Sequence, residues 1–122
     1  MRYNPDRKYI DQPCSYVSVG TGYEDITGKL FKGAMPAGLR RDGYLPLEDM
    51  NRFIRNTLLV RKRDKFVQGQ RPLLHEFLKN NTECCIICVK GHYVYARGEN
   101  YWSFFYNDND EVINVWYLRE EQ

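Results

Sequence analysis

The chain has 122 residues, of which 18 are basic and 16 are acidic. This length supports one hydrophobic core but not two, so we expect a single domain over residues 1–122. The balanced charge disfavours proteins that hold nucleic acid or a membrane surface through their net field. Because no apolar run is long enough to span a bilayer, the sequence also predicts no membrane segment.

The first eight residues are polar rather than apolar. A secretory signal needs an apolar segment there, so we expect a cytoplasmic protein. Thiols stay reduced in that compartment, and Cys84, Cys85 and Cys88 are close neighbours on one expected strand, where they cannot easily pair with each other. The four cysteines are therefore expected to be free.

The first half of the chain is expected to be mainly helical. After a short edge strand at 8–10, Pro13 favours a helix that begins at about residues 13–15. Gly20 and Gly22 predict that this helix is short, and the capping-box spacing of Thr21 and Glu24 predicts that a new helix begins there.

A loop is expected at 33–38, followed by a helix that Pro46 opens and that extends to about residue 56. Its amphipathic pattern places Met50, Phe53 and Ile54 on the buried face.

The second half of the chain is expected to be mainly strand. A strand is predicted at 57–61, with the basic run 61–65 as its exposed continuation, and a helix is predicted between Pro72 and Asn80. Two or three strands follow within 83–106, and a last one lies at 111–118. Helices that precede a mostly antiparallel sheet predict an α+β domain.

Cys14 is the candidate nucleophile, because a thiol at a helix N-terminus meets unsatisfied amides and the positive end of the helix dipole. That setting predicts a lowered thiol pKa. The alternative is a structural role, since cysteine is among the residue types that are most often buried.

His92 is the candidate base, because it begins an expected strand directly after Gly91, where another element can approach closely. Asn107 and Asp108 end the next strand and are candidates to orient the imidazole. The alternatives are a half-exposed strand histidine and an ordinary hairpin turn at 107–110.

No cofactor and no metal ion are predicted. The run from Cys84 to Cys88 lacks a second pair of ligands at a zinc-binding spacing. The polar stretch 107–110 lacks the glycine and the later glutamate of a calcium loop.

The chain order of Cys14, then Gly91 and His92, then Asn107 and Asp108 resembles the papain-like cysteine peptidase superfamily. The spacing of His92 and Asp108 is similar to that in the bacteriocin-processing peptidase domains of ABC exporters. The stretch 14–26 is also similar to small phage and bacterial papain-like proteins, in which a helix led by cysteine is followed by Thr-Gly and Tyr-Glu. These matches cover the chain from Asp11 to Asp108.

The resemblance implies a papain-like fold and a peptidase or related amide-bond hydrolase or transferase, with a protein or peptide as substrate. Cys14 would be the nucleophile, His92 the general base and then acid, and Asp108 the orienting group, with Asn107 as the fallback. The family's oxyanion donor is usually a glutamine about six residues before the cysteine, where this chain has Lys8; the nearby glutamine is Gln12.

Two other functions remain open. One is a catalytically degenerate papain-like domain of a phage-encoded protein, which would act as a protein-interaction module through aromatics such as Tyr93, Tyr95 and Trp102. Nucleic-acid binding through the basic run 61–65 with Arg40 and Arg41 is the weaker alternative, because a charge run is usually a solvated face.

Overall fold

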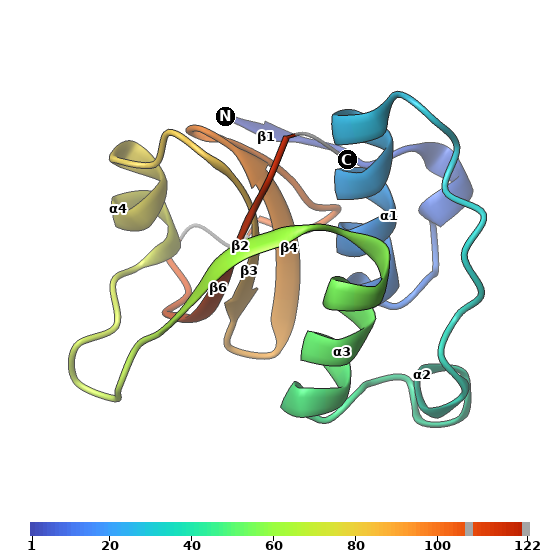
Figure 1. The fold of residues 1–122 in the computed structure, drawn as a ribbon. Coiled ribbons are helices and arrows are strands. Elements are labelled where there is room, and N and C mark those ends of the chain that lie inside the picture. The colour runs from blue at the N-terminus through green and yellow to red at the C-terminus, as the bar shows by residue number, and fades with distance from the viewer. Residues whose placement is uncertain (107–108, 121–122) are drawn as a thin grey trace.

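The computed structural model describes residues 1–106 and 109–120. In these residues, a six-stranded sheet separates α1 (Cys14–Thr27) and α3 (Leu47–Thr57) on one face from α4 (Leu74–Lys79) on the other (Figure 1). The α+β class is thereby confirmed. The sheet is mostly antiparallel, as expected.

The strand order across the sheet is β1-β5-β4-β3-β6-β2. The pair of β1 and β5 is parallel, and the pairs formed by the other strands are antiparallel. The strands are β1 (Arg2–Tyr3), β2 (Val60–Lys65), β3 (Cys84–Val89), β4 (His92–Arg97), β5 (Asn100–Trp102) and β6 (Val112–Leu118).

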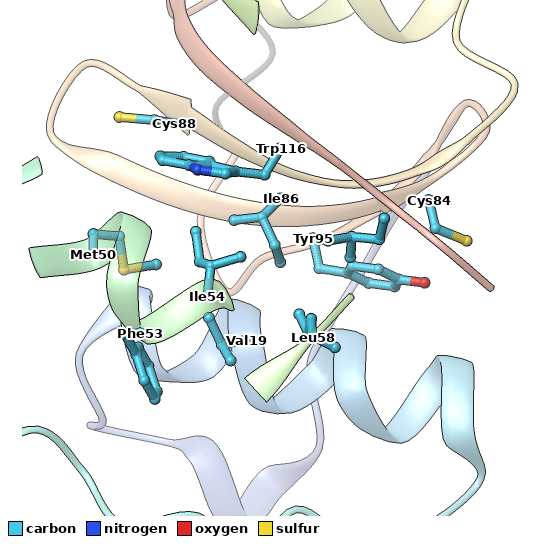
Figure 2. Close-up of a cluster of buried hydrophobic side chains, with 11 residues drawn as sticks. Val19, Met50, Phe53, Ile54, Leu58, Cys84, Ile86, Cys88, Tyr95 and Trp116 are labelled. Carbon is cyan, nitrogen blue, oxygen red and sulfur yellow. The ribbon is translucent and has the colours of Figure 1, made fainter. Parts of the chain in front are cut away.

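Strand β3 lies in the middle of the sheet because its residues are apolar on both faces and all six are buried. Successive side chains on a strand point to opposite faces, so β3 contributes to two cores. Cys84, Ile86 and Cys88 pack toward α1 and α3, and the alternate residues pack toward α4. Figure 2 shows the first core, in which Trp116 and Tyr95 lie between the sheet and the helices.

The first helix is longer than predicted, because Gly20 and Gly22 lie inside α1 instead of ending it. A Cβ at Gly20 would lie 2.3 Å from the Tyr9 hydroxyl, and one at Gly22 would lie 2.9 Å from the Tyr95 ring. The glycines therefore let two aromatic rings pack directly on the helix backbone. The helix start predicted at Thr21 is wrong for the same reason.

Three other boundaries differ from the predictions. The expected strand at 8–10 is a 3₁₀ helix, η1 (Arg7–Tyr9), and the short strand of the N-terminal arm is β1. Part of the expected loop at 33–38 belongs to α2 (Ala37–Asp42), and β2 begins at Val60, because α3 extends to Thr57. Helix α3 buries Met50, Phe53 and Ile54, as predicted.

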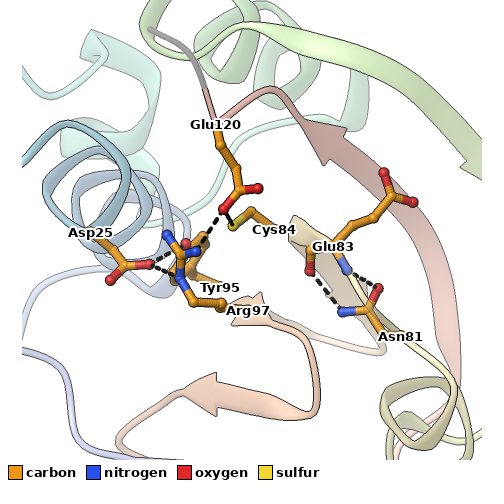
Figure 3. A network of polar contacts seen from close by, with 7 residues as sticks. All are labelled: Asp25, Asn81, Glu83, Cys84, Tyr95, Arg97 and Glu120. Atoms are coloured by element: carbon orange, nitrogen blue, oxygen red, sulfur yellow. Dashed lines mark hydrogen bonds and ion pairs between the residues drawn. The ribbon is translucent and has the colours of Figure 1, made fainter.

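A polar network lies at the end of the sheet where β3 begins and β4 ends (Figure 3). Asp25, near the end of α1, accepts hydrogen bonds from the Tyr95 hydroxyl at 2.5 Å and from Arg97 at 2.8 Å. Asn81 donates to the backbone carbonyls of Glu83 and Gly98, at 2.9 and 2.7 Å. These bonds hold α1 against β4 and fix the entry into β3.

Within residues 1–106 and 109–120, no helix combines the length and the apolar character that crossing a membrane requires.

Candidate functional site

Cys14 is the first residue of α1 and is half-buried. Pro13 precedes it in an extended conformation, and the Pro13 carbonyl accepts the hydrogen bond from Val17 at 3.0 Å that closes the first helical turn. The buried face of α1 packs on β4, so the start of the helix lies beside the start of that strand.

His92 begins β4, directly after the tight turn at Gly91, whose backbone has a φ of 74°. This left-handed conformation is favourable for glycine and sterically costly for most other residues. The turn is thus the local reason why the histidine sits at the very start of its strand, where its half-buried side chain can face α1.

One small pocket of about 40 Å³ brings the predicted residues together, because Gln12, Cys14 and His92 all line it. Tyr93, Ser103 and Phe105 also line it. Residues from two distant parts of the chain therefore meet at one point, between the start of α1 and the start of β4.

Ser103 is a site residue that the sequence patterns missed. It follows β5 directly, is 3% exposed, and its Oγ lies 2.9 Å from His92 Nε2. The backbone amide of Phe105 donates to the same Oγ at 3.0 Å, which fixes the hydroxyl in place. The alternation of side chains along β5 and the pairing of β5 with β4 could have pointed to this position. A lone serine, however, has no distinctive sequence pattern.

The Phe105 ring covers the imidazole. The two ring centroids lie 5.6 Å apart at an interplanar angle of 87°, an edge-to-face contact. Phe105 is itself 65% exposed, so one side of the pocket is closed by a side chain that faces solvent.

The prediction of a lowered thiol pKa is wrong for Cys14. Burial raises the pKa of Cys14 above its ordinary value, although backbone hydrogen bonds from Tyr93, Ser15 and Cys14 itself act in the opposite direction. Desolvation disfavours the thiolate more than the helix start favours it.

Burial also lowers the pKa of His92, and the charge of Asp110 opposes this shift more weakly. Both groups of the pair are therefore neutral at pH 7: Cys14 is a thiol and His92 is an uncharged imidazole. An uncharged imidazole is the form that can accept a proton.

Gln12 reaches the pocket through a tight backbone turn. Asp11 has a φ of 67°, and the Gln12 amide donates to the Tyr9 carbonyl at 3.1 Å. Aspartate tolerates the left-handed region better than most residues, so this turn can bring Gln12 beside Cys14. Lys8, at the position where papain-like peptidases usually have a glutamine, pairs with Glu24.

The other two predicted site residues, Asn107 and Asp108, lie outside the described residues.

Among the described residues, no group of three or more histidine, cysteine, aspartate or glutamate side chains is arranged to hold a metal ion. The thiols of Cys84, Cys85 and Cys88 are buried in the two cores, and all four cysteines are free.

The basic run 61–65 forms most of β2, an edge strand. Three of its four cations have local partners: Arg61 pairs with Glu83, Lys62 with Asp64, and Arg63 with Glu48. Local pairing of this kind is typical of a solvated surface strand.

None of the three aromatics named above as surface residues is fully exposed. Tyr95 is fully buried in the core between the sheet and α1, and Tyr93 and Trp102 are half-buried against the same core. Phe105 lines the pocket and is an exposed aromatic, with 65% of its surface accessible.

Comparison of the chain with protein-family models, with curated proteins and with solved structures finds no match.

Proposed function

We propose that the chain is a papain-like cysteine hydrolase, either a peptidase or a related amide-bond hydrolase or transferase. The observation that carries the proposal is the shared pocket of Cys14, from the start of α1, and His92, from the start of β4. A nucleophile and a base from these two positions, with a third group on the base, form the arrangement that thiol hydrolases use.

Ser103 takes the orienting position on the imidazole. A hydroxyl oxygen can accept two hydrogen bonds, so Oγ can accept from the Phe105 amide and from His92 Nε2–H at once. In that tautomer the Nδ1 nitrogen of His92 is unprotonated and serves as the base.

In the reaction, the Cys14 sulfur attacks the substrate carbonyl carbon while its proton passes to His92. The carbonyl electron pair moves to oxygen, where the Cys14 backbone amide and the Gln12 side chain donate to the oxyanion. Collapse breaks the C–N bond, and His92 gives its proton to the leaving amine. Water, deprotonated by His92, then hydrolyses the thioester and releases Cys14.

The proposal is tested by alkylation of the intact protein with iodoacetamide, followed by mass spectrometry. One adduct is expected, on Cys14, because the other three thiols are buried. At pH 7 His92→Ala is expected to slow this reaction at least about tenfold, since general-base assistance is lost. His75→Ala is the matched control, because His75 is an exposed histidine on α4, and it should leave the rate unchanged.

The pH dependence of the alkylation rate shows whether His92 acts as the base. In the wild type the alkylation rate should rise as His92 loses its proton, at a pH below the ordinary histidine pKa of 6.5. In His92→Ala the rate should rise only at a pH above the ordinary cysteine pKa of 9.0. Equal rates and profiles in the two folded proteins would contradict the hydrolase.

A second candidate function is a protein-interaction module built on the same site without catalysis. The observation that favours it is the exposure of Phe105 beside a pocket whose burial opposes charge on both Cys14 and His92. A His92→Ala protein with unchanged alkylation would support this candidate over the hydrolase.

A further inference from the structure

Two hollows continue from the Cys14 pocket along the surface. Gln12 lines both the pocket and a hollow of about 410 Å³. Gly33 and Ala34 line both that hollow and a further one of about 550 Å³ beside α3. We call the two hollows together the α2 groove, because the segment that enters α2 forms part of its wall.

The groove is preformed by contacts between its own walls. The Tyr16 hydroxyl donates to the Gly33 carbonyl at 3.0 Å, and the Phe31 amide donates to the Glu24 carboxylate at 2.9 Å. The Tyr16 ring also lies 5.4 Å from the ring of Phe31, centroid to centroid. These contacts hold the segment before α2 against α1, so a ligand would meet an ordered surface.

The lining is positively charged. Its cations are Lys8, Arg40, Arg41 and Arg52, and its acidic residue is Asp49. Three of the cations have partners within the described residues, as Lys8 pairs with Glu24, Arg41 with Asp42 and Arg52 with Asp49.

Arg40 is the exception. It is exposed, lines the hollow next to Gln12, and has no ion pair within the described residues. A guanidinium presents a planar fork of donors that matches a carboxylate. The unmatched charge in this groove is therefore complementary to an acidic side chain.

We propose that the α2 groove binds an extended polypeptide segment that carries an aspartate or glutamate near its reactive carbonyl, with the acidic side chain on Arg40. This proposal rests on the hydrolase function, for which it names the class of substrate. An extended chain suits the groove, because consecutive hollows can take alternate side chains while the backbone runs on toward the Cys14 pocket.

Binding is measured on Cys14→Ala, so that no turnover is needed. The probes are fluorescein-labelled decapeptides of alanine, serine and leucine in which one position in turn carries glutamate, glutamine or lysine. Fluorescence anisotropy is expected to show that the best glutamate peptide binds about fivefold or more tightly than its lysine counterpart. The preference should weaken as salt is added, since exposed charges are screened.

Arg40→Glu on the same background should abolish or reverse this preference. Lys79→Glu is the matched control, because Lys79 is also an exposed cation in the last turn of a six-residue helix, but on α4 at the opposite face of the sheet. It should leave the preference unchanged.

Equal binding of glutamate and lysine peptides, no binding of any peptide, or equal effects of the two charge reversals would each overturn the groove proposal. The alkylation of Cys14 is scored separately. If the groove tests fail but alkylation depends on His92, the hydrolase proposal stands. If glutamate is preferred through Arg40 but alkylation does not depend on His92, only the catalytic proposal is overturned.

Discussion

At the scale of the residue, a buried hydroxyl determines how His92 is held. Ser103 Oγ lies between the imidazole and the Phe105 amide, and the serine is almost fully buried. A base that is held at one nitrogen presents its other nitrogen in a defined direction, which is what proton exchange with Cys14 requires.

Ser103→Ala is therefore expected to slow the alkylation of Cys14 by about tenfold, because a small misplacement of a catalytic group is costly. Ser103→Thr keeps the hydroxyl and should retain most of the rate. Thermal unfolding monitored by circular dichroism should confirm that all three proteins are folded at the assay temperature. A fully active alanine variant would show that another group orients His92.

At the scale of the element, α1 is shaped by aromatic rings that approach its backbone. Gly22 faces Tyr95, which is fully buried and whose hydroxyl is held by Asp25. The ring cannot move aside easily, so the close packing of α1 on β4 depends on the missing side chain at Gly22.

Gly22→Ala is expected to reduce the free energy of unfolding by about 1–3 kcal/mol, the usual cost of overpacking a core. Gly38→Ala is the matched control, since Gly38 also lies in a helix but a Cβ there would lie at ordinary contact distances, 3.4 Å from Leu45 and 3.7 Å from the Arg41 guanidinium. That variant should be neutral or more stable by up to about 1 kcal/mol, as alanine favours a helix. Urea unfolding followed by tryptophan fluorescence measures both; equal effects would contradict the role of the ring contact.

At the scale of the whole molecule, the two cores contain thiols and phenols that must stay neutral. Burial raises the pKa of Cys84, Cys85 and Cys88 above the ordinary thiol value of 9.0, and raises the pKa of Tyr117 to about 12. In the unfolded chain these groups lose their protons at lower pH than in the folded protein.

The titration of these groups is thus expected to leave the free energy of unfolding unchanged below pH 9 and to reduce it as the pH rises above 9. For a fully buried group such as Cys85 the slope is about 1.4 kcal/mol per pH unit. Urea unfolding under reducing conditions between pH 8 and 10.5 tests this, with Cys85→Ala as the variant that should show a shallower slope. A stability that does not change over this range would contradict the buried, neutral state of the thiols.

The sequence by itself determined the α+β class, the buried face of α3, and the positions of α4, β3, β4 and β6. These follow from hydrophobic periodicity and from proline and asparagine at helix ends, which are local properties of neighbouring residues. Only the tertiary structure decided that α1 continues through Gly20 and Gly22, because the rings that occupy their missing side chains come from distant parts of the chain.

In the candidate site, too, some features follow from the sequence and others only from the tertiary structure. The residue types and chain order of Cys14, His92 and Gln12 marked them as candidates, but their meeting in one pocket depends on how α1 packs against β4. The raised pKa of Cys14 and the hydrogen bond between Ser103 and His92 were decided by the tertiary structure alone. Desolvation and hydrogen bonding at a site depend on groups that folding brings together from far apart, and no local pattern records them.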